Sequence, residues 1–300
     1  MFQKVDIEKE LRVLKSNVLH ILSTYPYLNN YLDISNDSTF RASNWLVTFP
    51  YNFLFDDSNQ VRYGNENNIE IIRKLAVINT LYGSFFLRED DVLDEYNLPL
   101  NEYKHVLIKM CYSRILHKLA VGQFLKLCGQ EIYSYIFHYE RKYYEALAWE
   151  KNNCILSSKT MFLQENLKYL GWKLYPLGIT YAAFCILNNQ KNKIPHCEEL
   201  IIKYHIAHQL IDDAKDYKKD IAKPDYSYLI RAFIGDCGDD EISLPLFKQW
   251  ISNSRIIENI IAIIVENLDA AKRIAYQLKF EYFVKQIEYQ KSRLQQLDNE

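Results

Sequence analysis

Residues 85–94 read FFLREDDVLD, and residues 209–220 read QLIDDAKDYKKD. Each stretch ends a long segment with helical apolar spacing, and each contains the pattern Asp-Asp-x-x-Asp. On a helix the first and last acids of this pattern lie one turn apart, with the middle acid beside them. Acids seldom follow core positions unless positive charge joins them there. Two such clusters facing each other would form an oxygen cage that suits Mg²⁺ and leaves room for a substrate phosphate.

The second stretch carries the stronger signal, because Asp212, Asp216 and Asp220 form a stripe along one helical face. The alternative is a solvated face whose charge is balanced by the neighbouring lysines. The apolar turns that precede the acids favour a site. Acid pairs at 56–57 and 239–240 lack a third Asp and are interpreted as loop residues. The expected metal ligands are Asp90, Asp91, Asp94, Asp212, Asp213, Asp216 and Asp220.

Composition indicates a globular helical protein. The 300 residues are 49% apolar and 25% charged, and only 8 Gly and 7 Pro favour helices over sheets. A net charge of −2 gives no general attraction to nucleic acid. Six scattered cysteines form no C-x-x-C pair, which argues against zinc and a disulfide framework. With no signal region at the start and no apolar run of roughly 18 residues, we expect a cytoplasmic protein that is not integral to a membrane.

Periodicity and breakers predict one all-α domain over residues 1–300, with about ten helices. A loop-rich segment with short helices is expected from Tyr25 to Asn67. The expected helices are Val5–Thr24, Ile69–Asp94, Asn101–Leu127, Gln130–Asn152, Ser158–Lys173, Pro176–Asn188, Pro195–Ile221, Tyr226–Phe233, Leu244–Glu266 and Asp269–Gln296. Ser157 and Ser158 are expected to cap the helix that they open.

Lys159 and Thr160 lie at the start of that helix, between the two acidic stretches. A lysine there opposes the helix dipole unless it serves a bound anion, although an exposed lysine of no special role is the simpler interpretation. Together with residues 85–94 and 209–216, the Lys-Thr pair resembles the class I isoprenoid superfamily of trans-prenyl diphosphate synthases and terpene cyclases. The resemblance covers roughly Ile69 to Tyr228 and implies a helical bundle around a deep apolar cavity.

The resemblance implies a role for each matching residue. Phe85 and Phe86 match the aromatic pair that forms the floor of the substrate pocket, and Lys159 matches the lysine that holds the diphosphate. About three Mg²⁺ ions would bind the diphosphate, and Asp90, Asp91, Asp94 and Lys159 would be catalytic. The residues expected to contact substrate are Tyr82, Phe85, Phe86, Arg114, Thr160, Phe162, Tyr181, Gln209 and Lys219.

Two departures from the family pattern bear on the reaction. Chain-elongating synthases carry an Arg-Arg pair after the first motif and an early Gly-Lys-x-x-Arg that binds isopentenyl diphosphate, and this sequence has neither. Without those cations a second diphosphate has little to hold it. The favoured prediction is therefore a class I terpene cyclase acting on a linear prenyl diphosphate, C15 before C20. The usual cyclase sensor arginine is also missing, and Lys159, Arg88 or Arg114 would replace it.

Two alternatives to the cyclase stay open. The first is a prenyl diphosphate synthase, either chain-elongating or head-to-head. The second is a non-catalytic partner subunit of a prenyl synthase, against which the intact acids argue. A di-iron bundle would need Glu-x-x-His on two helices, and only Glu102 and His105 provide it. No nucleotide-binding glycine motif is present. A homodimer is a possible assembly.

Overall fold

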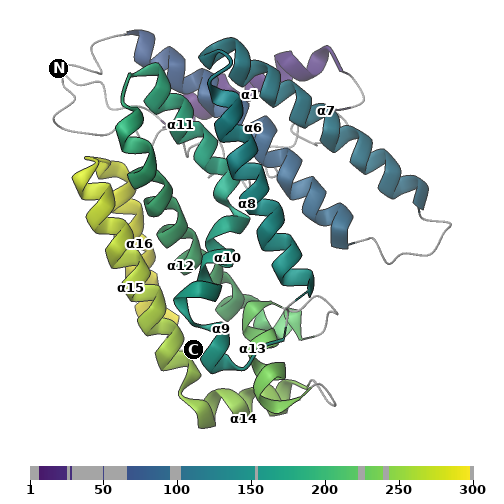
Figure 1. The fold of residues 1–300 in the computed structure, drawn as a ribbon, viewed down its shortest axis with the longest axis vertical. Helices are drawn as coiled ribbons and strands as arrows, with labels where there is room; N and C mark the ends of the chain where they lie inside the picture. The colour runs from purple at the N-terminus through teal and green to yellow at the C-terminus, as the bar shows by residue number, and fades with distance from the viewer. Residues whose placement is uncertain are drawn as a thin grey trace. The chain divides into compact units, whose positions relative to one another are not determined.

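The computed structural model describes residues 7–25, 28, 50, 66–94, 103–152, 155–221, 227–238 and 243–297. Within these ranges the regular secondary structure is helical and includes no strand (Figure 1). The prediction of an all-α fold is confirmed. Most of the segment expected to be loop-rich, from Tyr25 to Asn67, lies outside the described residues, as do the acid pairs at 56–57 and 239–240.

The chain divides into two compact units, and each is taken by itself below. Unit 1 comprises Met1–Ile136, Ile179–Asn192 and Lys279–Tyr282, and unit 2 comprises Phe137–Gly178, Lys193–Leu278 and Phe283–Glu300. The first acidic stretch belongs to unit 1, and the second belongs to unit 2. The prediction of a single domain over residues 1–300 stays a prediction.

Unit 1 is built around one long helix. Its helices are α1 (Ile7–Ser23), α6 (Glu66–Asp94), α7 (Tyr103–Cys128) and α11 (Gly178–Leu187). α6 packs along α7 and against α1, and residues 75–83 of α6 are all buried. A helix buried on every side holds its polar groups only with partners. Here the Thr180 hydroxyl of α11 donates to Asn79 Oδ1 at 2.7 Å, which fixes α11 to the middle of α6.

Unit 2 is organised on α12. α8 (Ile132–Asn152) begins in unit 1 and continues here. The other elements are α9 (Ser158–Met161), α10 (Gln164–Lys173), η4 (Tyr175–Leu177), α12 (Ile194–Asp220), α13 (Tyr228–Cys237), α14 (Leu244–Ser254), α15 (Ile256–Gln277) and α16 (Glu281–Leu297), with η5 (Lys191–Lys193) just before α12. α12 lies beside α15, α10 and α13 (Figure 1). A Cβ on Gly171 would lie 2.8 Å from Ile202 Cγ2, so glycine is what lets α10 approach α12.

Three of the expected helices have wrong boundaries, namely Ser158–Lys173, Leu244–Glu266 and Asp269–Gln296. Ser158–Lys173 is two helices, α9 and α10, separated at Phe162 and Leu163. The break expected after Glu266 falls instead at Arg255, whose φ of 49° lies in the left-handed region, and the next break falls at Lys279 with φ 62°. Asn267 is an interior residue of α15, where its side chain is buried and donates to the carbonyl of Ile263.

Among the described residues, no single helix is long and apolar enough to cross a membrane. One bent pair, residues 164–173 with 175–187, reaches that threshold by length and composition alone.

Candidate active site

The first acidic stretch closes α6, which ends at Asp94 without a basic residue in its last turn. Asp90 is half-buried. The side chains of Asp91 and Asp94 lie outside the described part of the chain. Carboxylates at this end of a helix oppose the helix dipole, which places partial negative charge there. Their position is therefore electrostatically poor for folding alone and favours a role with a bound cation.

An aromatic layer lies on α6 directly before these acids. Phe85 and Phe86 are buried, with ring centroids 4.5 Å apart, and Tyr82 meets Phe86 edge to face at 4.9 Å. α7 completes the layer, because the His117 ring lies 4.6 Å from Phe85 and the Phe124 ring lies 5.8 Å from Tyr82. Such aromatic pairs contribute about 0.5–1.5 kcal/mol each beyond their burial. The layer forms a firm apolar base one to two turns from Asp90, while its role as a pocket floor stays a prediction.

The second acidic stretch lies near the end of α12, and its outward carboxylates already have cationic neighbours. Asp212 and Asp216 are about half exposed, at 48% and 53% of the side chain. His208 Nδ1 lies 3.2 Å from Asp212 Oδ2, and Lys219 Nζ lies 2.9 Å from Asp216 Oδ1. Burial raises the pKa of Asp212, but the hydrogen bond and charge of His208 and the charge of Lys215 outweigh it, so this pKa lies below its ordinary value.

Asp213 lies on a different face of α12 and is only 6% exposed. Its Oδ2 accepts a hydrogen bond of 3.3 Å from the backbone N–H of Leu229, in the first turn of α13. Burial raises the pKa of Asp213 to about 7, although Lys173, the Leu229 N–H and Gln209 act in the opposite direction. These contacts favour a structural role for Asp213, and its expected role as a metal ligand stays a prediction.

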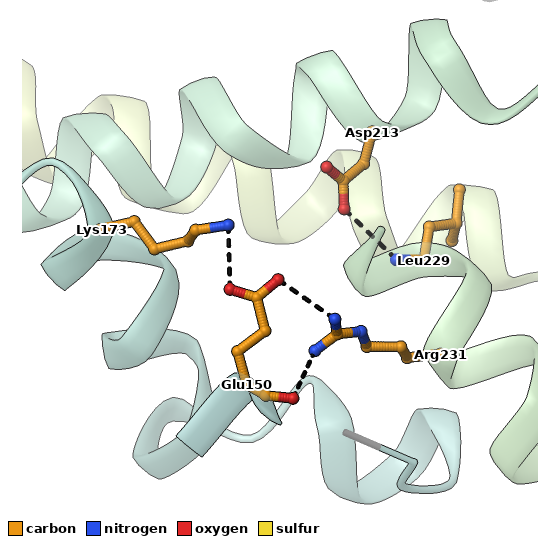
Figure 2. Close-up of polar contacts among 5 residues, drawn as sticks. All are labelled: Glu150, Lys173, Asp213, Leu229 and Arg231. Carbon is orange, nitrogen blue, oxygen red and sulfur yellow. Dashed lines mark hydrogen bonds and ion pairs between the residues drawn. The ribbon is translucent and has the colours of Figure 1, made fainter. Parts of the chain in front are cut away.

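A buried polar network holds the start of α13 (Figure 2). The Arg231 guanidinium, on a residue only 8% exposed, donates to the Glu150 carbonyl at 2.8 Å and lies 3.2 Å from the Glu150 carboxylate. Lys173 Nζ lies 3.0 Å from the other carboxylate oxygen. A buried guanidinium is tolerated only with partners of this kind. Glu150 therefore joins α8 to both α10 and α13, close to the Asp213 cap.

The far end of α13 holds the turn that carries Lys159 and Thr160. The backbone N–H of Ser158 donates to Asp236 Oδ1 at 2.9 Å, and Trp250 Nε1 donates to Asp236 Oδ2 at 3.0 Å. A Cβ on Gly235 would lie 2.0 Å from the carbonyl oxygen of Leu156, so only glycine permits this approach. α13 thus fixes the Lys159 turn at one end and accepts the Asp213 cap at the other, about 10 Å apart along its axis.

The capping expected of Ser157 is wrong. Its side chain makes no capping bond, and its hydroxyl lies 3.2 Å from that of Thr160, while Asp236 supplies the carboxylate at this helix start. The Asp236 carboxylate therefore supplies negative charge at this helix start. The position of Lys159 does not by itself require a bound anion. Lys159 is exposed, and its contact with a diphosphate stays a prediction.

The remaining expected residues are placed as follows. In unit 1, Arg114 is exposed on α7, and Tyr181 is buried on α11 with its ring 5.7 Å from that of Phe280. In unit 2, the Phe162 ring lies 5.9 Å from that of Tyr228, whose hydroxyl donates to the carbonyl of Met161 at 2.6 Å. Asp220 is half-buried in the last turn of α12. Among the described residues, no three His, Cys, Asp or Glu side chains form a group that could hold a metal ion.

Three residues of the site region were missed. His208 precedes Asp212 by four residues, and this helical spacing could have identified His208 as a neighbour of the acid. His117 joins the aromatic layer from α7, and Asp236 reaches Ser158 across 78 positions of sequence. The last two depend on tertiary contacts for which the sequence carries no local pattern.

Comparisons with known proteins are informative at the level of structure. No protein-family model matches the chain, and no curated protein matches it in sequence. A geranylgeranyl pyrophosphate synthetase from the archaeon Geoglobus acetivorans superposes with a TM-score of 0.67 at 13% identity, over 95% of this chain and 98% of that one.

Two further solved structures are similar. A heptaprenyl diphosphate synthase from Staphylococcus aureus gives a TM-score of 0.63 at 14% identity, over 97% of this chain and 99% of that one. A medium/long-chain length prenyl pyrophosphate synthase from Arabidopsis gives 0.62 at 13% identity, over 92% and 96%. The chain therefore has the all-helical fold of the prenyl diphosphate synthases, as the sequence motifs led us to expect.

Proposed function

We propose that this chain is a Mg²⁺-dependent prenyltransferase that extends an allylic prenyl diphosphate. The observation that supports the proposal most is the likeness to three prenyl diphosphate synthases along nearly the whole of each chain. The Asp-Asp-x-x-Asp patterns add to it, because they lie near the ends of α6 and α12. Proteins that share a fold at such low sequence identity can catalyse different reactions. The function is therefore inferred from the acids and the residues around them.

The donor set suits magnesium. Asp212 and Asp216 are one turn apart and about half exposed, and Asp90 is half-buried at the end of α6. Mg²⁺ prefers carboxylate oxygens and keeps several sites for water or phosphate. Bound there with Asp91, Asp94 and Asp220, about three such ions would neutralise a diphosphate and make it a leaving group.

The chain's own residues would do the rest. Lys159, at the turn held by Asp236, would neutralise part of the diphosphate charge, with Thr160, Gln209 and Lys219 as further polar contacts. The aromatic layer of Phe85, Phe86 and Tyr82 would meet the end of the hydrocarbon chain, with Phe162 and Tyr181 along it. Apolar and aromatic walls exclude water and stabilise positive charge that develops on the allylic carbon.

Cyclisation of a single prenyl diphosphate is the second candidate. It is favoured by one observation, the absence of both an Arg-Arg pair after Asp94 and an early Gly-Lys-x-x-Arg. A second diphosphate would then find little positive charge to bind it. The structural comparisons favour elongation, whereas the absence of the two basic motifs favours cyclisation. The two reactions give different products from the same substrate, so one assay separates them.

The test is incubation of the purified chain with C10, C15 and C20 allylic diphosphates, with and without isopentenyl diphosphate, in Mg²⁺ and in EDTA. Elongation predicts a longer prenyl diphosphate that forms only when both substrates and Mg²⁺ are present. A hydrocarbon or alcohol formed without isopentenyl diphosphate would favour the cyclase. No pyrophosphate release under any condition would refute both and favour a non-catalytic partner subunit. Cytoplasmic location and homodimer assembly are proposed with the same function.

A further inference from the structure

Unit 1 contains a pocket of about 450 Å³ between α1, α6 and α7. Each helix contributes one face to it, with residues at the helical spacing of three and four. The lining residues are Asn17, His20 and Ile21 of α1, Glu70, Arg73, Lys74, Val77 and Ile78 of α6, and Gln123, Lys126 and Leu127 of α7. A volume of this size falls within the range of small-molecule sites, roughly 300–1,000 Å³.

The pocket is apolar at its base. Val77 and Ile78 of α6 are buried, at 6% and 4% exposure. Ile21 of α1 and Leu127 of α7 add apolar side chains from the other two helices. Apolar surface that lines a concavity gains free energy when a ligand removes it from water. The base therefore suits a short hydrocarbon chain.

The rim of the pocket is basic. Among the described lining residues, Arg73, Lys74 and Lys126 carry positive charge and Glu70 carries negative charge, and His20 lies beside them. Glu70 lies 3.8 Å from Lys74, and both are about half exposed, so this pair is weak. Lys126 has no ion-pair partner within the ranges that the structure describes. The whole chain, by contrast, has a net charge of −2.

Helix dipoles explain only part of this charge. His20 and Lys126 lie in the last turns of α1 and α7, where cations are favourable in any protein. Arg73 and Lys74 lie in the third turn of the long helix α6, away from its C-terminal end. α6 and α7 thus bring Arg73, Lys74 and Lys126 to one apolar concavity, which matches a ligand with an anionic head.

The pocket is separate from the acidic stretch on α6. Val77 precedes Asp90 by thirteen residues, or roughly 20 Å along the helix axis. The buried rings of Tyr82 and Phe86, with Phe124 of α7, lie at the α6 turns between them. A ligand in this pocket would therefore not compete for the acids or need the metal.

We propose that this pocket binds a small amphiphilic anion, with a phosphate or carboxylate head on the basic rim and an apolar chain on Val77 and Ile78. Binding joins α1 to α6 and α7, and so stabilises unit 1 against unfolding by mass action.

Calorimetric titration and thermal unfolding of the full chain in EDTA test the proposal, with octyl phosphate, octanoate, inorganic phosphate and octanol as probes. The expected result is saturable binding of one octyl phosphate or octanoate, with a raised Tm and at least tenfold weaker binding of either the head or the tail alone. Equal affinity for inorganic phosphate and octyl phosphate would overturn the amphiphile assignment, as would the absence of saturable binding.

A matched pair of α7 variants locates the site. Lys126→Gln removes an exposed rim cation and should weaken octyl phosphate binding about fivefold or more. Lys118→Gln removes an exposed lysine of α7 that does not line the pocket and should leave the affinity unchanged. Equal affinities in the two variants would overturn the assignment. Asp90→Asn should bind the probe as the parent chain does, so this result is independent of the proposed prenyltransferase activity.

Discussion

The two acidic stretches share one pattern but differ in how their charge is compensated. α6 ends on its acids and has no basic residue in its last turn, whereas the last turn of α12 contains Lys218 and Lys219. On α12, His208 Nδ1 lies 3.2 Å from Asp212, and Lys219 Nζ lies 2.9 Å from Asp216. The second stretch is therefore largely balanced by its own helix, while the first opposes the dipole of the helix that carries it.

This difference suggests different relations to the fold. The α12 stretch is built into unit 2, because Asp213 caps α13 and α13 in turn holds the Lys159 turn through Asp236. The α6 stretch follows an aromatic layer in which the rings of Tyr82, Phe85 and Phe86 pack on one another. Removal of a carboxylate charge should therefore raise the free energy of unfolding at the first stretch and lower it at the second. Activity should need both stretches.

The largest expected effect is on turnover. If both stretches hold the metals of one site, Asp90→Asn and Asp212→Asn should each lower Mg²⁺-dependent turnover by a factor on the order of 100 to 1,000, because each removes charge that stabilises the transition state. Product formation from labelled allylic diphosphate measures it, and circular dichroism confirms that the variants fold. Full activity in either variant would remove that acid from the site.

The next largest effect is expected from a steric change at α13. Gly235→Ala places a Cβ against the Leu156 carbonyl, and we expect a loss of about 3 kcal/mol in the free energy of unfolding. Gly122→Ala is the matched control, because a Cβ there meets no atom within 4 Å and α7 should gain up to about 1 kcal/mol. Urea unfolding measures both, and equal effects would show that α13 does not hold the Lys159 turn closely.

Much of the fold follows from the sequence, and the exceptions have physical causes. Apolar periodicity over residues 69–94 and 195–221 is long enough to predict α6 and α12 within a few residues. The break at Arg255 occurs without glycine or proline, so no local signal marks it. Asn267 resembles a helix end in sequence, but its side-chain N–H donates to the carbonyl of Ile263 inside α15. Tertiary packing decides both.

The candidate site follows from the sequence only where its spacing is local. The acids and the aromatic pair were found because they repeat at helical intervals. The division of roles between Asp212 and Asp213 could not be found, since it depends on the N–H of Leu229, sixteen residues away. Likewise, no pattern in residues 155–160 indicates that Asp236 occupies the start of α9.

A smaller effect concerns pH and the scaffold before the second stretch. Burial, with the nearby charge of His208, lowers the pKa of His205 to about 3 from an ordinary value of 6.5, although a backbone hydrogen bond with Gly171 acts in the opposite direction. Below pH 6.5 the unfolded chain binds a proton that the folded chain does not. Stability is therefore full above pH 6.5 and is lost as the pH falls toward 3, by about 2 kcal/mol at pH 5.

The pH effect is measured as the difference in unfolding free energy between the parent chain and His205→Leu at pH 7 and at pH 5. Relative to that variant, the parent should lose about 2 kcal/mol between the two values. His196→Gln, at an exposed position of the same helix, is the control. Its free energy of unfolding should change with pH as that of the parent does. An equal pH response in His205→Leu and the parent would show that folding does not change the pKa of His205.

The smallest expected effect is the sharpest comparison of the two stretches, because its sign differs between them. Asp90→Asn removes a charge that opposes the dipole of α6 and should raise the free energy of unfolding by about 0.3–1 kcal/mol without metal. Asp212→Asn removes the partner of His208 and should lower it by up to about 1 kcal/mol. Thermal unfolding in EDTA measures both, and added Mg²⁺ should stabilise the parent chain more than either variant if the acids hold the ion. Destabilisation by Asp90→Asn as large as that by Asp212→Asn would mean that the first stretch, too, is part of the scaffold.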